Sequence, residues 1–456
     1  MSAAERPWAG RRLHFVGVGG AGMSAYARAA HELGAEVSGS DGASGPYDER
    51  LRADGVLDAS IGHDAANVPA GTEVELVYSS AVPAENVERA AARERGLPEH
   101  PRAELLAELS ALRRTIAVAG THGKTTTSSM LAHALRAAGM DPGWLIGAPI
   151  GGGLPNAHWS AGEWLVIEAD ESDRSMLSLN VEIAVLTNVE LDHHATFSSL
   201  AELQEAFAEF LAGARQAVVW NQPELLALRE GPVIAYDADE LELLAGGSRF
   251  DWHGHAVRLS VPGAHNALDA AGALAAAELA GVDPAGAIEG LESFEGAGRR
   301  FQRVGEGAKG AQIYEDYAHH PTEIAATLRG ARTLSHDRVV AVFQPHLYSR
   351  TALLAREFGA ALALADVVVV LDVYPARERS EDHPGVSGLL IAEAVADAAA
   401  GRPVYWLAKF ADAERVLHGL LGQGDVCVVM GAGDVDELAR MLTRPHGQHA
   451  ADEERK

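Results

Sequence analysis

The segment from Thr115 to Gly139 limits the fold of this chain more than any other. It begins as a β-branched, apolar run, passes through a glycine turn and continues as an alanine-rich stretch with helical periodicity. The turn consists of Gly120, Thr121, His122, Gly123, Lys124, Thr125 and Thr126. A glycine turn between a strand and a helix directs backbone amides and the helix dipole at one point, where a phosphate group is stabilised. The segment therefore predicts an α/β domain with a nucleotide phosphate site.

This turn is a shortened form of the usual phosphate loop. The longer pattern has a glycine where this chain has Val118, but the core Gly-x-x-Gly-Lys-Thr remains. Lys124 is expected to balance the charge of the β- and γ-phosphates, and Thr125 is expected to reach Mg²⁺. A glycine turn with a solvated lysine is the alternative, but it leaves the flanking strand and helix as coincidence.

Alternation of apolar strands with helical segments continues through the whole chain. At 456 residues the chain exceeds the length of one hydrophobic core, which stops growing at about 250 to 300 residues. We predict an α/β fold with three domains, at residues 1–112, 113–297 and 298–456. The first is predicted to be Rossmann-like, and the second to be a phosphate-loop domain whose parallel sheet is covered on both faces. The third is predicted to be a Rossmann-like sheet of four strands.

The first block carries a second glycine turn. Gly17, Gly19 and Gly22 form the pattern G-x-G-x-x-G between a predicted strand and a predicted helix, and Asp41 ends the next strand. Such glycines let the backbone approach a diphosphate at a helix N-terminus. NAD is the default ligand for this pattern, but a nucleotide sugar and a purely structural turn both remain open.

Acidic segments follow two strands of the second block. Residues 168–173 read Glu-Ala-Asp-Glu-Ser-Asp, and residues 187–194 read Thr-Asn-Val-Glu-Leu-Asp-His-His. Open α/β sheets bind ligands at the carboxyl ends of their strands, and carboxylates suit Mg²⁺. The first segment predicts a magnesium site, and the second predicts a further cation or a substrate contact. The alternative is a solvated acidic loop.

Two polar segments of the third block occupy the same kind of position. Residues 316–323 and 343–350 each follow a predicted strand. Arg350 at the end of the second segment suits a carboxylate, because a guanidinium can bind it through two parallel hydrogen bonds. We interpret both segments as a site for a second substrate, with capping and packing roles as the alternative.

Composition excludes several classes of partner. Lys and Arg number 37 against 64 Asp and Glu, for a formal net charge of -27, so nucleic acid is not an expected partner. The chain has one cysteine, Cys427, which rules out an intramolecular disulfide. No apolar run approaches the roughly 18 residues of a membrane span. We expect a cytoplasmic protein without a membrane partner.

Eight segments together carry a family resemblance. They are GVGGAGMS, AGTHGKTTT, EADESD, TNVELDHH, HNALDA, GRRF, DYAHHPTE and QPHLYSR. In this order, across residues 12–434, they resemble the Mur ligases, and among these the branch that joins L-alanine to the lactyl carboxylate of UDP-N-acetylmuramate. The resemblance implies ATP-dependent ligation through an acyl phosphate in peptidoglycan precursor synthesis. It also implies a UDP-binding first domain, an ATP-binding second domain and an amino-acid-binding third domain.

The resemblance also assigns roles to individual residues. Those implied for the UDP substrate are Gly17, Gly19, Gly20, Gly22, Asp41, Ser79 and Ser80. Those implied for ATP are Gly120, Thr121, His122, Gly123, Lys124, Thr125, Thr126, Asn266 and Arg299. Those implied for two Mg²⁺ ions are Thr125, Glu168 and His193. Those implied for the amino acid are Tyr317, His319 and Arg350. The catalytic set is Lys124, Glu168, His193, Arg299 and His319, and Arg300 lies beside Arg299.

The chain departs from the family pattern in three respects. Leu347 replaces an arginine that is frequent in this branch, which makes Arg350 the better candidate for the alanine carboxylate. His194-Ala195 replaces a frequent Met-Asp pair, and no lysine is evident that matches the carbamylated lysine of some sister ligases. The expected substrates are UDP-N-acetylmuramate, L-alanine and ATP, and we expect a monomer or a weak homodimer.

Three other functions remain as alternatives. The sister enzyme that attaches a recycled tripeptide to the same sugar nucleotide shares nearly every motif and differs in its acceptor pocket. An NAD-dependent oxidoreductase would bind NAD at Gly17. A nucleotide sensor without catalysis would not require so many acidic and histidine segments.

Overall fold

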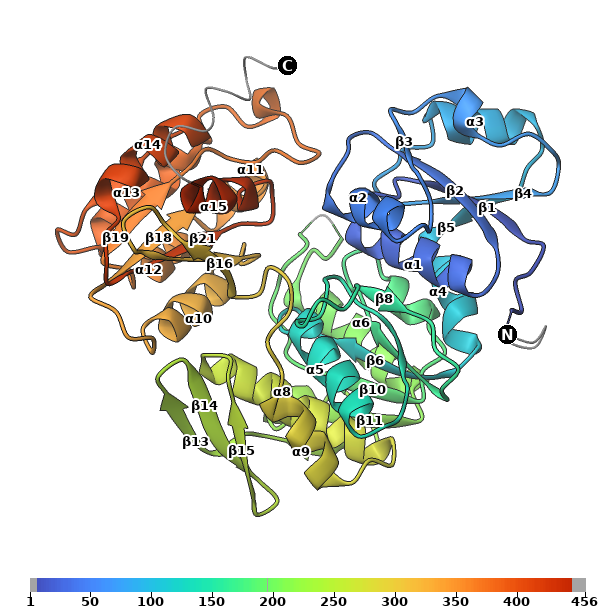
Figure 1. Cartoon of the computed structure of the whole chain (residues 1–456), viewed down its shortest axis with the longest axis horizontal. Coiled ribbons are helices and arrows are strands. Elements are labelled where there is room, and N and C mark those ends of the chain that lie inside the picture. Colours follow the sequence, from blue (N-terminus) through green and yellow to red (C-terminus); the bar gives the residue numbers. More distant parts are fainter. Residues whose placement is uncertain (1–5, 195, 445–456) are drawn as a thin grey trace. The chain divides into compact units, whose positions relative to one another are not determined.

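The computed structural model describes residues 6–194 and 196–444, and these form two compact units. The first unit covers residues 1–239, 252–257 and 268–294 within that range, and the second covers residues 240–251, 258–267 and 295–444. Figure 1 shows the ribbon coloured along the sequence. Each unit is described separately below.

The first unit begins with a five-stranded parallel sheet in the order β3-β2-β1-β4-β5. Its strands are β1 (Arg12–Val16), β2 (Glu36–Asp41), β3 (Ser60–Ile61), β4 (Val74–Tyr78) and β5 (Glu99–Pro101). Its helices are α1 (Ala21–Glu32), α2 (Pro46–Ala53), α3 (Val87–Glu94) and α4 (Arg102–Ala111). This strand order is that of a Rossmann-type sheet, so the prediction for the first block is confirmed.

The second sheet of this unit has seven strands in the order β12-β11-β10-β6-β9-β7-β8. They are β6 (Arg114–Ala119), β7 (Gly143–Leu145), β8 (Ala157–His158), β9 (Trp164–Glu168), β10 (Ile183–Leu186), β11 (Gln216–Trp220) and β12 (Ile234–Tyr236). All pairings are parallel except β7 with β8. The helices that follow in sequence are α5 (Lys124–Ala137), α6 (Leu200–Gly213), α7 (Pro223–Leu226), α8 (Ala264–Leu279) and α9 (Pro284–Glu292).

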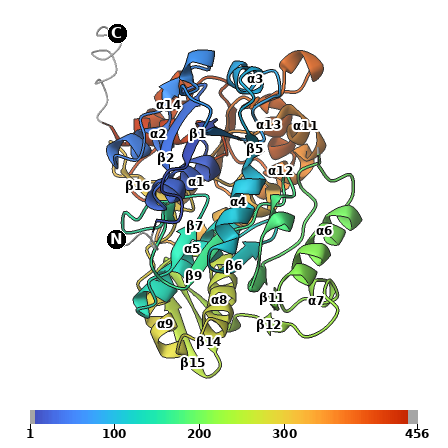
Figure 2. The ribbon, with the colours of Figure 1, turned by 90° about the vertical axis from the view of Figure 1, so that its right-hand side faces the viewer.

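Helices cover both faces of the seven-stranded sheet. Leu203, Phe207 and Phe210 of α6 are buried against Ala117 and Leu186 on one face. Side chains alternate between faces along a strand, and α5 packs against β6 and β9 on the other side. Figure 2 shows α5 and α6 on opposite sides of these strands. A strand that is covered on both faces reads as a continuous apolar run, and such runs were the basis of the prediction.

One hydrophobic cluster of the first unit contains residues of both sheets. Helix α1 packs against β7 and β8, so that its buried face meets side chains of the second sheet. Met23 and Ala30 of α1 belong to the same buried cluster as Leu145, Leu165 and Ile167. The first domain is therefore joined to the second by apolar packing as well as by the chain connection.

The prediction of simple strand–helix alternation is wrong for residues 239–259. Three consecutive strands lie there, and they form a separate sheet in the order β13-β14-β15. Their bounds are β13 (Asp239–Leu244), β14 (Gly247–Trp252) and β15 (His255–Leu259). β13 is rich in carboxylates and almost wholly exposed, so the sequence offers no apolar run there that marks a strand.

The second unit contains a six-stranded sheet in the order β16-β17-β21-β18-β19-β20, in which β16 is antiparallel to β17. The strands are β16 (Gln302–Glu306), β17 (Gln312–Asp316), β18 (Arg338–Phe343), β19 (Val367–Val370), β20 (Val404–Trp406) and β21 (Asp425–Met430). The helices are α10 (Pro321–Ala331), α11 (Tyr348–Leu353), α12 (Ala355–Leu362), α13 (Gly388–Ala398), α14 (Phe410–Leu420) and α15 (Asp436–Thr443).

The four predicted strands of this sheet are all present, but the number four is wrong. The two missed strands, β16 and β20, lie at the two edges, where one is polar and the other is only three residues long. The Rossmann-like character of the block is confirmed. Cys427 is buried in the central strand β21, as expected for a small strand residue. Among the described residues, none of the helices combines the length and the hydrophobicity needed to cross a bilayer.

Candidate active site

The phosphate loop lies at the carboxyl end of β6 and leads directly into α5. Gly120 and Gly123 have left-handed backbone conformations, with φ of +138° and +83°. A Cβ at Gly120 would lie 2.0 Å from Oγ1 of Thr187, and one at Gly123 would lie 2.4 Å from Oδ1 of Asp269. Both glycines are therefore required by conformation and by space. Lys124 is the first residue of α5, so the loop amides lie at a helix N-terminus.

The segment after β10 holds this loop in place. Asn188 accepts from the Thr121 N–H through its carbonyl (3.1 Å) and from the His122 N–H through its side-chain oxygen (2.9 Å). The Thr187 hydroxyl donates to the His122 carbonyl at 2.6 Å, and the Glu190 N–H donates to the Thr121 hydroxyl at 2.9 Å. Residues 187–190 thus support the phosphate loop. This framework role was not predicted for the segment.

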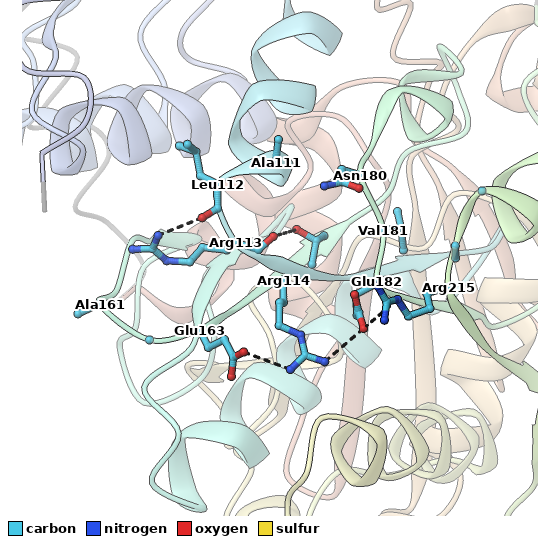
Figure 3. Close-up of a pocket in the computed structure, with 14 residues that line it drawn as sticks. Ala111, Leu112, Arg113, Arg114, Ala161, Glu163, Asn180, Val181, Glu182 and Arg215 are labelled. Atoms are coloured by element: carbon cyan, nitrogen blue, oxygen red, sulfur yellow. Dashed lines mark hydrogen bonds and ion pairs between the residues drawn. The ribbon is translucent and has the colours of Figure 1, made fainter. Parts of the chain in front are cut away.

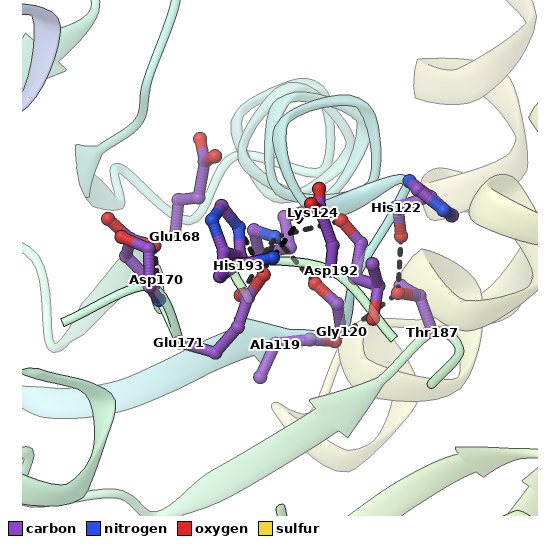
Figure 4. Close-up of polar contacts among 12 residues, drawn as sticks. Ala119, Gly120, His122, Lys124, Glu168, Asp170, Glu171, Thr187, Asp192 and His193 are labelled. Carbon is purple, nitrogen blue, oxygen red and sulfur yellow. Dashed lines mark hydrogen bonds and ion pairs between the residues drawn. The ribbon is translucent and has the colours of Figure 1, made fainter. Parts of the chain in front are cut away.

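Lys124 lies at the centre of the polar contacts in Figure 4. Its Nζ donates to the carbonyl oxygens of Gly120 (2.6 Å) and Thr121 (3.1 Å), and it lies 2.9 Å from Oε2 and 3.0 Å from Oε1 of Glu171. Burial acts to lower the pKa of Lys124, but Glu171 and Asp170 outweigh it and raise that pKa above its ordinary value. Lys124 is therefore a fixed cation beside the loop amides.

Glu168 ends β9 and faces the first turn of α5. Its Oε1 accepts from the Thr125 hydroxyl at 2.9 Å, and its Oε2 accepts from the Gly147 N–H at 2.6 Å. A Cβ at Gly147 would lie 2.8 Å from Oε2, so this glycine makes room for the carboxylate. Gly147 was missed in the sequence, because an isolated glycine after a short strand carries no motif.

His193 and Glu171 complete the group. His193 Nε2 lies 3.3 Å from Oε1 of Glu171, whose side chain is wholly buried. Burial acts to lower the pKa of His193, but the contact with Glu171 and the charge of Asp192 raise it above its ordinary value. The backbone of His193 is left-handed, with φ of +53°. Glu171 was noted in the acidic run without an assigned role. Ala195, which follows His194, lies outside the described residues.

The donors in this group fit a divalent cation. A threonine hydroxyl, two buried or half-buried carboxylates and an imidazole nitrogen lie at the carboxyl ends of β6, β9 and β10. Oxygen donors of this kind suit Mg²⁺, which often keeps part of its water shell. The predicted ligands Thr125, Glu168 and His193 are thus brought into one neighbourhood, and Thr126 follows as a buried residue of α5.

Helix α8 contributes to both units. Asp269 accepts from the Thr127 hydroxyl at 3.0 Å and so connects α8 to α5 within the first unit. Asn266 belongs to the second unit, where it is buried and donates to the Pro262 carbonyl at 2.7 Å. Its assignment to an adenine contact stays a prediction.

The first glycine loop lies at the carboxyl ends of β1, β2 and β4. The N–H groups of Gly17 and Val18 donate to the Ser40 carbonyl, and the N–H of Gly19 donates to Oδ2 of Asp41 at 2.8 Å. A Cβ at Gly17 would lie 3.1 Å from Cβ of Ser79. The structure therefore brings together Gly17, Gly19, Asp41 and Ser79.

The remaining predicted residues of that loop differ in their surroundings. Gly20 is the N-cap of α1, in extended conformation, and Ser80 is exposed. A Cβ at Gly22 would lie 3.3 Å from Nη1 of Arg102, at the start of α4. Gly22 thus leaves space for the Arg102 side chain, and its role toward a ligand stays a prediction.

In the second unit, Tyr317, His319 and Arg350 converge after β17 and β18. His319 Nδ1 contacts the Tyr317 carbonyl at 3.0 Å, and its ring lies 6.1 Å from that of His346. Nη1 of Arg350, a buried side chain, lies 3.5 Å from Nδ1 of His346. Burial, followed by the charge of His319, lowers the pKa of His346 to about 3. His346 stacks on Tyr374, which no motif had indicated.

Arg299 and Arg300 flank the same tyrosine. Their guanidinium carbons lie 4.9 Å and 5.2 Å from the centre of the Tyr317 ring. Nη2 of Arg299 donates to the carbonyls of Gly431 and Gly433, at 3.1 Å and 3.0 Å. Arg299 has a left-handed backbone, with φ of +55°. The predicted arginine is therefore fixed by the loop after β21 of its own unit.

A hollow of about 810 Å³ lies at the amino ends of central strands of the seven-stranded sheet (Figure 3). It is lined by the residues that join α4 to β6 and by the amino ends of neighbouring strands. Arg114 in its wall bridges Glu163 and Glu182, at 3.2 Å each. The reactive groups described above lie at the carboxyl ends of the same strands, so this hollow is not part of their site.

Three family models match the chain in sequence order. Residues 12–114 match "Mur ligase family, catalytic domain", residues 118–277 match "Mur ligase middle domain", and residues 299–433 match "Mur ligase, glutamate ligase domain". The chain belongs to the Mur ligase family. As a Mur ligase it is an ATP-dependent enzyme, and membership of the family implies ATP and Mg²⁺ as its cofactors. Membership of this family decides against the oxidoreductase and sensor alternatives.

Individual relatives of this Mur ligase cover nearly its whole length. A UDP-N-acetylmuramate–L-alanine ligase of Mycobacterium sp. (strain JLS) is 43% identical in an alignment of 473 positions, gaps included, that covers 96% of each chain. The enzyme of that name from Kineococcus radiotolerans is 46% identical in an alignment of 447 positions, gaps included, that covers 93% of this chain and 94% of its own. The crystal structure of UDP-N-acetylmuramate-alanine ligase from Thermotoga maritima matches with a TM-score of 0.82 and 26% identity. That match covers 98% of this chain and 100% of the Thermotoga chain.

Proposed function

We propose that this Mur ligase joins L-alanine to the lactyl carboxylate of UDP-N-acetylmuramate, with cleavage of ATP to ADP and phosphate, in peptidoglycan precursor synthesis. The observation that carries the proposal is the grouping of Lys124, Thr125 and Glu168 at the strand ends of a chain that is 43% to 46% identical to ligases of that name. The substrates are small molecules, and we expect the enzyme to act in the cytoplasm as a monomer or weak homodimer.

The reaction proceeds in two transfers. A carboxylate oxygen of the sugar nucleotide forms a bond to the γ-phosphorus of ATP while the bond to the β–γ bridging oxygen breaks, which gives an acyl phosphate and ADP. The amine of L-alanine then forms a bond to the acyl carbon, phosphate leaves, and the amine loses a proton. A bare carboxylate is a poor electrophile, so phosphorylation supplies the leaving group. The protein has to position the reactants and offset their charge.

Residues of the central site are suited to the first transfer. Lys124 would exchange its contacts with the loop carbonyls for the β- and γ-phosphate oxygens and balance their charge. The loop amides from Gly120 to Thr126 would surround the phosphates. Thr125, Glu168 and His193 would hold two Mg²⁺ ions. When bound, these ions shield the negative charges of carboxylate and phosphate from each other.

Residues of the second unit are suited to the second transfer. Arg350, held beside His346, would pair with the carboxylate of L-alanine. Tyr317 and His319 would line the alanine side, and Arg299 would contact the γ-phosphate. Asn266 would contact adenine. Residues 1–112 would then bind the UDP part through the loop at Gly17, residues 113–297 would bind ATP, and residues 298–456 would bind the amino acid.

The test is phosphate release from ATP with Mg²⁺ and UDP-N-acetylmuramate, with L-alanine, glycine, L-serine or the tripeptide L-alanyl-γ-D-glutamyl-meso-diaminopimelate supplied separately. We expect release that requires both the sugar nucleotide and L-alanine. If phosphate were released only when the tripeptide is the acceptor, the enzyme would be assigned to peptide recycling. If no phosphate were released with any of the four acceptors, the proposal would be contradicted.

A further inference from the structure

Arg102 connects two parts of the first unit that serve different substrates in the proposed function. It is the first residue of α4, directly after β5 of the N-terminal sheet. Its Nη2 lies 2.8 Å from Oδ2 of Asp170, and its Nε lies 2.6 Å from Oδ2 of Asp173. Both aspartates belong to the acidic loop after β9. The side chain of Arg102 is 13% exposed and those of Asp170 and Asp173 are 36% and 21% exposed, so these two ion pairs are partly shielded from water.

The same guanidinium borders the first glycine loop. Its Nη1 lies 3.3 Å from the position of a Cβ at Gly22, and the Tyr26 hydroxyl lies 3.8 Å from that position. Gly22 is in the first turn of α1, whose N-terminus would receive the diphosphate. An anion bound there would lie beside the guanidinium and favour its present position.

The acidic loop depends on the two aspartates for its shape. Asp170 Oδ1 accepts from the Ser172 N–H at 2.9 Å, and Asp173 Oδ1 accepts from the Ser175 N–H at 3.1 Å. Each aspartate therefore fixes the loop backbone with one oxygen and Arg102 with the other. Glu171 lies between them, where it contacts Lys124. The position of Arg102 is thus transmitted to the partner of the phosphate-binding lysine.

A second contact joins the same two regions. The Tyr47 hydroxyl, on α2, donates to the Gly147 carbonyl at 3.0 Å. The Gly147 N–H in turn donates to Oε2 of Glu168 at 2.6 Å. Two carboxylates of the phosphate site, Glu168 and Glu171, are therefore each linked to the N-terminal domain through one intermediate. Arg102 is the link that carries charge.

We propose that Arg102 is a positioning residue that couples the glycine loop of the first domain to the acidic loop of the phosphate site. Binding of the sugar nucleotide and binding of Mg²⁺ with the ATP phosphates then strengthen each other. The sugar nucleotide in this inference rests on the proposed function. The coupling itself follows from two ion pairs and one close approach within the first unit. Coupling between two sites is reciprocal, so it can be measured from either ligand.

The first measurement is calorimetric binding of the ATP analogue AMP-PNP with Mg²⁺, with and without saturating UDP-N-acetylmuramate. In the wild type we expect the sugar nucleotide to tighten analogue binding about fivefold or more. In Arg102→Met this ratio falls towards one. Arg102→Lys restores part of it, because a lysine keeps the charge but lacks the fork that reaches both aspartates. An unchanged ratio in Arg102→Met would overturn the proposal.

Matched variants separate coupling from general damage. Arg114→Met removes a guanidinium that also bridges two carboxylates, Glu163 and Glu182, but at the amino ends of the strands. This variant should leave the ratio unchanged. Asp173→Asn should lower the ratio, and Arg102→Met combined with Asp173→Asn should lower it no further than Arg102→Met alone. If the two substitutions lowered the ratio additively, Arg102 and Asp173 would not act through a shared contact. If Arg102→Met does not fold, Asp173→Asn decides.

A second measurement does not require the sugar nucleotide. The Mg²⁺ concentration for half-maximal AMP-PNP binding should rise about tenfold in Arg102→Met and in Asp173→Asn, because a partner that orients metal ligands is lost. If the half-maximal Mg²⁺ concentration rose in neither variant, the proposal would be overturned. If the wild type does not bind UDP-N-acetylmuramate, the proposed function is wrong, and the Mg²⁺ measurement alone decides the role of Arg102.

Discussion

The two glycine loops of this Mur ligase have the same local form but different surroundings. Each connects the carboxyl end of a parallel strand to the N-terminus of a helix. The loop after β6 is packed so closely that a Cβ at Gly120 would overlap the Thr187 hydroxyl, at 2.0 Å. The loop after β1 is looser, since Cβ atoms at Gly17 and Gly19 would meet neighbours at 3.0 to 3.1 Å.

The charges around the loops differ as well. The second loop has Lys124 among its amides and several carboxylates beside it. The first loop has one carboxylate, Asp41, which accepts from the Gly19 N–H, and the guanidinium at its border, Arg102, is paired with Asp170 and Asp173. A loop that positions a transferring phosphoryl group needs a cation and metal ligands, whereas a loop that only docks a diphosphate is served by amides and a helix dipole. In the proposed function, the same βα turn would therefore support chemistry in one domain and docking in the other, depending on what packs around it.

The largest expected effect is loss of the cation in the second loop. Lys124→Ala should lower kcat for phosphate release about 1000-fold, because a preorganised charge at the transferring group is removed. Affinity for UDP-N-acetylmuramate should stay within about twofold, since binding at the first loop uses other residues. Lys309→Ala, at an exposed lysine between β16 and β17, is the control. Turnover near that of the wild type in Lys124→Ala would remove the distinction between the loops.

The close packing around the second loop can be tested by replacing its first glycine, Gly120, with alanine. Gly120→Ala should lower the free energy of unfolding by about 3 kcal/mol or more, from the left-handed backbone and the overlap with Thr187. Gly139→Ala is the matched control, because it is also left-handed but has open space around its Cβ, and it should lower that free energy by about 1 kcal/mol. Urea denaturation gives both values. Equal losses would show that packing around Gly120 is unimportant.

Beneath the first loop, a buried charge has a structural role. Glu88 accepts from Ser40 at 2.7 Å, lies 3.0 Å from Nε2 of His14 and accepts from Asn67 at 2.9 Å. Burial acts to raise the pKa of Glu88, but these contacts outweigh it and lower that pKa to about 2. The stabilisation is therefore fully present above the ordinary pKa of 4.5 and is lost as the pH falls from 4.5 towards 2.

Glu88→Gln should accordingly reduce the free energy of unfolding by about 3 kcal/mol at pH 7, and the difference from the wild type should shrink below pH 4.5. Urea denaturation between pH 7 and pH 3 measures this difference. A difference that does not change with pH would show that shape, and not charge, is what Glu88 contributes.

The smallest expected effect concerns the carboxylate of the first loop. Asp41→Asn should raise KM for UDP-N-acetylmuramate about fivefold to tenfold, because the hydrogen bond from the Gly19 N–H loses its charged acceptor. The value of kcat should change by less than about twofold, because Asp41 holds a docking loop. Steady-state kinetics at saturating ATP and L-alanine give both constants. A fall in kcat without a change in KM would place Asp41 in the chemistry.

Much of the fold followed from local patterns. Continuous apolar runs marked β6, β9, β10 and β18, since a strand covered on both faces has no polar side. The exposed strand β13 and the polar edge strand β16 were missed for the converse reason. Gly120, Gly123 and Lys124 could be predicted to form a phosphate site because strand, glycine turn and helix are adjacent in sequence.

Other parts of the site could not be predicted, because their partners are distant in sequence. Gly147 and Glu168 are 21 residues apart, and Arg102 and Asp173 are 71 residues apart. The segment after β10 was interpreted as a cation or substrate site, yet Thr187 and Asn188 support the phosphate loop. Nothing in their own sequence distinguishes a threonine that braces a loop from one that binds a ligand.

The sequence by itself determined the order of the blocks, the strand and helix character of their cores, and the two glycine turns, since these depend on periodicity and on backbone freedom within about 20 residues. The tertiary structure alone decided that Arg102 faces the acidic loop, that Gly147 makes room for Glu168 and that Tyr374 stacks on His346. Strand order brings such residues together, and strand order is set by the packing of whole elements.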